Sequence, residues 1–188
     1  MYPKLSELYS VMDWHENQTD HKPGESVGLF VTIPQELSQQ FPQQGKELED
    51  KSPAHITLLY LGSVPLQLQN KVYSVTQRYC DFVRPFSVKL GRPKKFVNDE
   101  EQIILHSPVK SKRLFNLHDI LKQAFLQNQI PVDNKFPEYR PHITIAYCNS
   151  EDELNNYKHI KPQGSFEINH LWLWGGNQAE IIHLGKKR

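Results

Sequence analysis

The chain has 188 residues, of which 38% are hydrophobic and 23% charged, and its formal net charge is +1. This length and composition fit one globular domain with a sizeable core and argue against a disordered chain. The near-neutral charge argues against a protein that coats a long nucleic acid. We expect a single domain over residues 1–188, in which an irregular polar segment at 1–26 precedes a folded part at 27–185.

The first half of the folded part predicts two strands and a long helix. One strand is VGLFVTIP at 27–34, and the other is HITLLYLG at 55–62. A short helix before Pro42 and a polar loop after it separate them. Apolar residues then recur at steps of three and four, which predicts a helix ending before Pro85. These residues are Leu68, Val72, Val75, Tyr79 and Phe82.

The second half repeats this order. Strands at 86–96 and 102–109 are joined by the polar turn VNDEE, and HITIAY at 142–147 forms another strand. The segments SFEINHLWLW and AEIIHLG, separated by GGNQ, predict a closing hairpin. A second amphipathic helix lies between the strands, with Leu114, Leu117, Leu121, Ala124 and Phe125 on its apolar face. The order suggests a duplication, with two lobes related by a rough two-fold.

A histidine and a threonine two residues apart open one strand in each half. Residues two apart in a strand share a face, so His55 and Thr57 point the same way, as do His142 and Thr144. If the lobes are related by a two-fold, the two pairs meet across a cleft.

Two histidines at one site can perform phosphodiester chemistry without a metal. The neutral imidazole accepts a proton from the attacking hydroxyl, and the protonated imidazole donates one to the leaving oxygen. The threonine hydroxyls can donate hydrogen bonds to the other phosphate oxygens. A single H-x-T motif is weak evidence, because threonine favours strands in any case. Two copies in matching contexts make the functional interpretation the better one, although which histidine is the acid stays open.

The duplicated motif and its surroundings resemble the 2H phosphoesterase superfamily, also called LigT-like or 2′-5′ RNA ligase-like. The resemblance covers about residues 27–185 and includes GLFVTIP, HITLLYLG, PFSVKLGRPKKF with IILHSPV, YRPHITIAY and FEINHLWLW. It implies an α+β, bilobal fold, with two lobes of antiparallel sheet and flanking helices around a central groove. It also implies a cofactor-free phosphodiesterase acting on RNA-like linkages. His55 and His142 map onto the family's acid and base, and Thr57 and Thr144 onto its phosphate-binding positions. Many members have a serine near the end of the last long strand, where this chain has LWLWGG.

Three further residues are candidates for substrate binding. Trp174 either stacks on a base or belongs to the core, and Phe30 presents the same alternatives from the first strand. Trp172 fits the core better. Arg140 either neutralises phosphate beside the second motif or forms an ion pair with Glu138 or Glu153.

The remaining histidines and basic clusters favour structural roles. His106 and His183 lie in apolar strands, although His106 could line the groove. A metal site formed by His15 with His21, or by the motif histidines, lacks the usual ligand spacing, so no metal is expected. The clusters RPKK at 92–95 and KKR at 186–188 fit a solvated turn and a solvated tail better than a site that steers an anion.

The sequence leaves the substrate open. The near-neutral charge favours a small nucleotide or short oligonucleotide: a cyclic dinucleotide or trinucleotide or a 2′-5′ oligoadenylate first, and an RNA end with a 2′,3′-cyclic phosphate next. The alternative is a binding module of the same fold that holds a nucleotide or RNA end without turnover. Cys80 and Cys148 are too few for a disulfide framework, and no secretory or membrane-spanning pattern occurs. We expect a cytoplasmic monomer that binds neither long nucleic acid nor a membrane.

Overall fold

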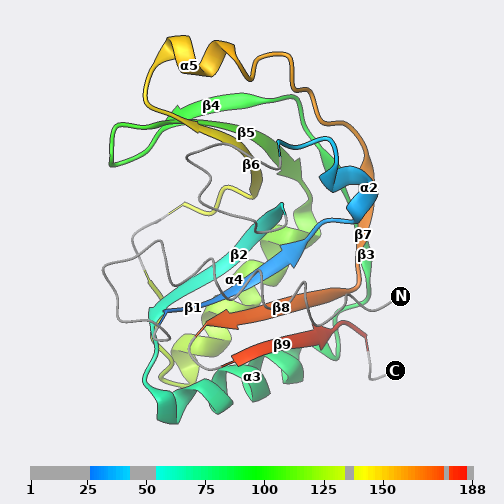
Figure 1. Cartoon of the computed structure of the whole chain (residues 1–188). Helices are drawn as coiled ribbons and strands as arrows, with labels where there is room; N and C mark the ends of the chain where they lie inside the picture. Colours follow the sequence, from blue (N-terminus) through cyan, green and yellow to red (C-terminus); the bar gives the residue numbers. More distant parts are fainter. Residues whose placement is uncertain (1–25, 43–53, 134–137, 176–177, 186–188) are drawn as a thin grey trace.

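The computed structural model describes residues 26–42, 54–133, 138–175 and 178–185. Within these ranges the chain forms two antiparallel sheets with helices packed beside them (Figure 1). The predicted irregular segment at 1–26 and the tail at 186–188 lie outside the described residues, apart from Ser26. The α+β class predicted from the sequence is confirmed.

The first sheet carries the first H-x-T motif. Its strand order is β2-β1-β8-β9, with β1 at Ser26–Thr32, β2 at His55–Ser63, β8 at His170–Gly175 and β9 at Gln178–His183. All three pairings are antiparallel. The predicted strands at 27–34 and 55–62 and the closing hairpin are confirmed.

The second sheet carries the second motif. Its strand order is β4-β5-β3-β7, and β6 pairs with β5. The bounds are Phe86–Leu90 for β3, Lys94–Val97 for β4, Ile103–Lys110 for β5, His142–Cys148 for β6 and Ser165–Ile168 for β7. β6 matches the predicted strand at 142–147, and β5 matches 102–109.

Two segments predicted as continuous strands are divided in the structure. The segment 86–96 breaks after Leu90 for two reasons. Gly91 approaches Pro108 so closely that a Cβ on Gly91 would lie 3.0 Å from the Pro108 carbonyl oxygen. Pro93 has no N–H to donate to a neighbouring strand. The segment 165–174 breaks at Asn169, where β7 pairs with β3 in one sheet and β8 pairs with β1 in the other. This segment therefore joins the two sheets.

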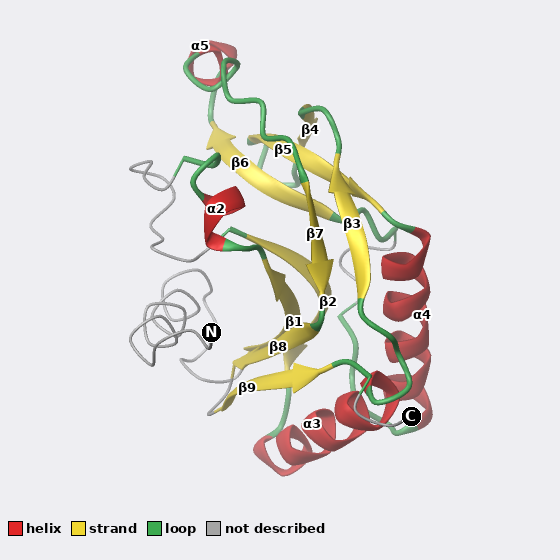
Figure 2. Cartoon of the chain, turned by 90° about the vertical axis from the view of Figure 1, so that its right-hand side faces the viewer, coloured by secondary structure: helices red, strands yellow, loops and turns green. Residues whose placement is uncertain are grey.

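The two long helices lie on one side of the sheets (Figure 2). They are α3 at Leu66–Cys80 and α4 at Lys112–Gln127. All five apolar residues predicted to face inward from α4 are buried. On α3, Val72 and Val75 are buried, but Phe82 is 71% exposed because the helix ends at Cys80. That part of the prediction was wrong.

The short helices complete the secondary structure. α2, at Gln35–Ser38, is the short helix expected before Pro42, whereas α5, at Glu151–Asn155, was not predicted. Cys80 and Cys148 are both buried, and burial raises the pKa of the Cys80 thiol to about 12. No helix in the described part of the chain is long and apolar enough to cross a membrane.

The apolar residues form two separate clusters. The main core lies between the sheets and the helices α3 and α4, whereas Phe30, Trp172 and Trp174 form a second cluster. Leu29 and Val31 belong to the main core, so Phe30 lies on the opposite face of β1. We call the face of each sheet that is turned away from the main core its outer face.

Candidate active site

The first motif lies on the outer face of β2. Ile56 and Leu58 belong to the main core, so the alternation of the strand places His55 and Thr57 on the other side. Phe30 stands opposite Thr57 on the neighbouring strand. Its ring meets the His55 ring edge to face, with 5.3 Å between ring centroids.

An aromatic wall adjoins His55. Trp174 lies 6.1 Å from the His55 ring and 4.7 Å from Phe30, centroid to centroid. The structure thus places both aromatic candidates, Phe30 and Trp174, beside the first motif, where both are buried in a core cluster. Trp172 is buried as expected, but in this wall and not in the main core. Among the described residues, its indole nitrogen has no hydrogen-bond partner.

The second motif repeats this arrangement on β6. Ile143 and Ile145 belong to the main core, which places His142 and Thr144 on the outer face. His106 stands opposite Thr144 on β5. Its ring meets the His142 ring with 5.0 Å between centroids.

The two motifs therefore share one local design. In each sheet, the motif threonine faces an aromatic ring on the next strand, and this ring contacts the motif histidine. The ring is Phe30 in the first sheet and His106 in the second. β2 and β6 contact each other where the two sheets meet (Figure 1).

A backbone hydrogen bond determines which nitrogen of His142 carries the proton. Nδ1 of His142 lies 2.6 Å from the carbonyl oxygen of Arg140. A carbonyl oxygen can only accept, so Nδ1 donates and Nε2 keeps its lone pair in the neutral ring. Burial lowers the pKa of His142, and the bond to Arg140 opposes this shift in part. His142 is therefore a neutral imidazole near pH 7, suited to accept a proton at Nε2.

His106 is neutral as well. Burial lowers the pKa of His106 to about 4, and repulsion from the protonated form of His142 and from Lys94 and Arg140 adds to this shift. Its Nδ1 has no hydrogen-bond partner in the described part of the chain. The sequence predicted either a structural role or a position in the groove for His106. In the structure, its ring contacts the His142 ring.

Arg140 contributes through both its side chain and its backbone. The guanidinium pairs with Glu138, with Nε 3.0 Å and Nη2 2.5 Å from the same carboxylate oxygen. The sequence left Arg140 between phosphate binding and an ion pair with Glu138 or Glu153, and the structure shows the ion pair with Glu138. The hydrogen bond that its carbonyl accepts from His142 was not foreseen, because the spacing of side-chain types carries no signal for it.

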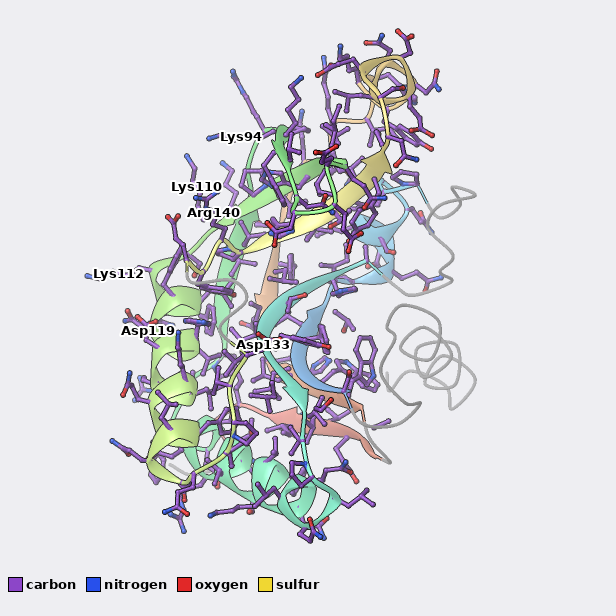
Figure 3. All side chains as sticks on the ribbon, turned by 90° about the vertical axis from the view of Figure 1, so that its left-hand side faces the viewer. Lys94, Lys110, Lys112, Asp119, Asp133 and Arg140 are labelled. Atoms are coloured by element: carbon purple, nitrogen blue, oxygen red, sulfur yellow. The ribbon has the colours of Figure 1, made fainter. Side chains whose placement is uncertain are left out.

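A basic hollow of about 710 Å³ lies beside His142. Its lining includes Phe96, His106 and Pro141, together with five cationic side chains and one carboxylate, Glu138. The cations are Lys94, Lys95, Lys110, Lys112 and Arg140. Figure 3 shows Lys94, Lys110, Arg140 and Lys112 along one edge of the molecule, down to the start of α4. Two of these lysines, Lys94 and Lys95, belong to the RPKK cluster, which was expected to be a solvated turn; these two residues form the start of β4.

The described residues contain no group of three or more histidine, cysteine, aspartate or glutamate side chains placed to hold a metal ion. His15 and His21, which the sequence raised as a pair of ligands, lie outside these residues.

Comparison with known proteins identifies the family. The model of the 2′-5′ RNA ligase superfamily matches residues 30–180, so the chain belongs to this family of LigT-like 2H phosphoesterases. This confirms the identification made from the two motifs. An RNA 2′,3′-cyclic phosphodiesterase of Bacillus subtilis is 33% identical over 93 residues, which are 49% of this chain and 50% of the relative. The chain spans at most about half the length of the curated relatives that it matches.

Solved structures show the same fold. The protein TT0787 of Thermus thermophilus superposes with a TM-score of 0.68 at 14% identity, covering 87% of this chain and 100% of that protein. E. coli LigT in its apo form gives a TM-score of 0.56 at 16% identity, covering 86% of this chain and 95% of LigT.

Proposed function

We propose that the protein is a metal-independent phosphodiesterase that opens the 2′,3′-cyclic phosphate at the end of a short RNA. The observation that carries this proposal is the fixed tautomer of His142, whose Nδ1 donates to the Arg140 carbonyl while burial keeps the ring neutral. A neutral imidazole with a free Nε2 is what a general base requires. Family membership and the named activity of the Bacillus subtilis relative support the same reaction.

In the proposed reaction, His142 accepts a proton from a water molecule at Nε2 as the water oxygen bonds to phosphorus. The bond from phosphorus to one ribose oxygen breaks, and His55 donates a proton to that oxygen, which leaves a phosphomonoester and a hydroxyl. Thr57 and Thr144 donate hydrogen bonds to the non-bridging phosphate oxygens, where negative charge increases. Phe30 and Trp174 are almost fully buried, so they pack against the His55 ring and hold its orientation while the substrate binds elsewhere.

Three observations support the substrate assignment. The relative is named for a 2′,3′-cyclic phosphate, and crystal structures of E. coli LigT contain 3′-AMP or phosphate. The concentration of cations beside His142 favours an RNA end, although the whole chain is nearly neutral. Cyclic dinucleotides and trinucleotides and 2′-5′ oligoadenylates, which the net charge alone favours, are the competing substrates.

The test is a turnover assay in EDTA with each of these substrates and with a short RNA ending in a 2′,3′-cyclic phosphate. We expect the RNA end to be opened fastest. His55→Ala and His142→Ala should each reduce kcat by about 10²- to 10⁴-fold, the usual contribution of a general acid or base. His159→Ala is the matched control, because His159 is exposed and outside both motifs.

Full turnover by either motif variant would contradict the mechanism. If no substrate is turned over but a nucleotide still binds, the protein is a binding module of the same fold.

A further inference from the structure

We propose that the basic hollow beside His142 binds the nucleotide adjacent to the reacting phosphate, so that the preferred substrate is an RNA strand and not a mononucleotide. This inference rests on the proposed function, because it assigns a second subsite to the same substrate. It concerns the surface formed by β4, the end of β5, the start of α4 and residues 138–141.

The hollow is continuous with the second motif. Lys94 stands opposite His106, which in turn stands opposite Thr144, so these three residues lie in one row across β4, β5 and β6. Pro108 stands opposite His142 and also lines the hollow. His106 both lines the hollow and contacts the His142 ring at 5.0 Å. A strand that leaves the reacting phosphate on this side therefore enters the hollow directly.

Three of the five cations at the hollow are available to a ligand. Lys95 pairs with Glu151, and Arg140 pairs with Glu138. Lys94, Lys110 and Lys112 form no salt bridge or hydrogen bond with a described residue. Lys112 is also the first residue of α4, where the helix dipole adds positive potential. Gathering unpaired cations costs free energy by mutual repulsion, and a bound phosphate offsets that cost.

Aromatic rings accompany these lysines. Phe96, Phe115 and Tyr139 line the hollow, and Phe115 is 41% exposed. Tyr139 is held in place by stacking on His118 at 4.1 Å and by an edge contact with Phe115 at 5.3 Å. Proteins that bind single-stranded nucleic acid combine cations for the backbone with exposed rings for the bases.

The size of the hollow agrees with one nucleotide. Its volume of about 710 Å³ lies within the usual range of small-molecule sites. In this arrangement, Lys110 and Lys112 neutralise the phosphate that precedes the reacting one, and Phe115 presents a face to its base.

The test compares Lys110→Gln/Lys112→Gln with Arg113→Gln/Lys122→Gln. The control pair removes the same charge from positions on α4 that do not line the hollow. Binding is measured by fluorescence anisotropy with a labelled trinucleotide RNA ending in a 3′-phosphate, over a series of KCl concentrations. Turnover is measured with the trinucleotide and the mononucleotide that both end in a 2′,3′-cyclic phosphate.

We expect the first variant to bind the trinucleotide about tenfold more weakly, with a smaller salt dependence. The slope of log Kd against log [KCl] should fall by about 1.4, because each lysine contact to a single strand contributes about 0.7. The ratio of kcat/KM for the trinucleotide to that for the mononucleotide should fall by a similar factor. The control variant should match the wild type.

The outcomes separate this inference from the proposed function. Lysine-dependent binding without any turnover would support the subsite while contradicting the enzyme. Turnover of both substrates with equal trinucleotide affinity in the two variants would overturn the subsite, and so would a wild-type protein that does not bind the trinucleotide.

Discussion

His55 and His142 belong to copies of the same motif, but each contacts a different aromatic residue on the neighbouring strand. Phe30 beside His55 cannot ionise, whereas His106 beside His142 can, and its pKa of about 4 keeps it uncharged at neutral pH. At neutral pH, each motif histidine is therefore in contact with an uncharged aromatic ring, Phe30 or His106. The hydrogen bond from His142 to the Arg140 carbonyl then fixes the orientation of the base.

The pH profile should reflect this environment. If His142 is the base, kcat/KM falls with decreasing pH as the ring of the free enzyme becomes protonated. Because burial lowers the pKa of His142, the midpoint of the acidic limb should lie below about 6.5, the ordinary histidine value. The measurement is kcat/KM for a 2′,3′-cyclic nucleotide across the acidic and neutral range.

His106→Phe is the control for this profile. It keeps an aromatic ring against His142, as Phe30 does against His55, and removes only a group that is uncharged near the midpoint. The midpoint should therefore stay in place. An acidic midpoint at or above the ordinary histidine value would show that His142 is not the base in this environment.

The motif residues could be predicted from the sequence, whereas their neighbours could not. A two-residue period is enough to place His55 with Thr57 and His142 with Thr144 on the outer faces. The position of His106 against His142 depends on the register between β5 and β6, which no local pattern encodes. The same holds for Lys94, which was expected in a turn and stands opposite His106.

At the scale of elements, the junction of β1 and β8 depends on Gly175. Its φ is +110°, and a Cβ there would lie 1.6 Å from the Ser26 carbonyl oxygen. Gly175→Ala should therefore separate the ends of these strands and lower the free energy of unfolding by about 3 kcal/mol. Urea unfolding monitored by tryptophan fluorescence measures this loss.

Gly62→Ala provides the comparison. Gly62 has φ +67°, but the nearest atom to its Cβ position is 3.5 Å away, on Asp133. The substitution should lower the free energy of unfolding by only about 1–2 kcal/mol, which is the cost of placing a residue with a Cβ in the left-handed conformation. Equal losses in the two variants would show that the close contact at Ser26 does not decide the stability of the β1–β8 junction.

Elements that a local sequence pattern determines were predicted correctly. The apolar face of α4 is buried as the helical period requires. The division of 165–174 was missed because it depends on which distant strand supplies the partner. The division of 86–96 had a local signal in Gly91 and Pro93 that was overlooked. α5 had a local signal that was overlooked: Ser150 caps the helix by accepting from the Glu153 N–H, and acidic residues fill its first turn.

At the scale of the molecule, each sheet supplies one motif, and the segment containing β7 and β8 joins the sheets. β2 and β6 contact each other, which favours one shared site with an acid from one sheet and a base from the other. Two independent sites would instead make each histidine sufficient for part of the activity. The two arrangements predict different kinetics for the double variant.

His55→Ala/His142→Ala should be no less active than the worse of the single variants. When two groups act in one transition state, losing the first already removes most of what the second contributes, so the effects on kcat/KM are far from additive. The measurement is kcat/KM for the single and double variants on the same RNA end, with His159→Ala as the reference. Singles that each keep about half of the wild-type rate, together with an inactive double variant, would instead indicate two separate sites and would refute the division of acid and base between the sheets.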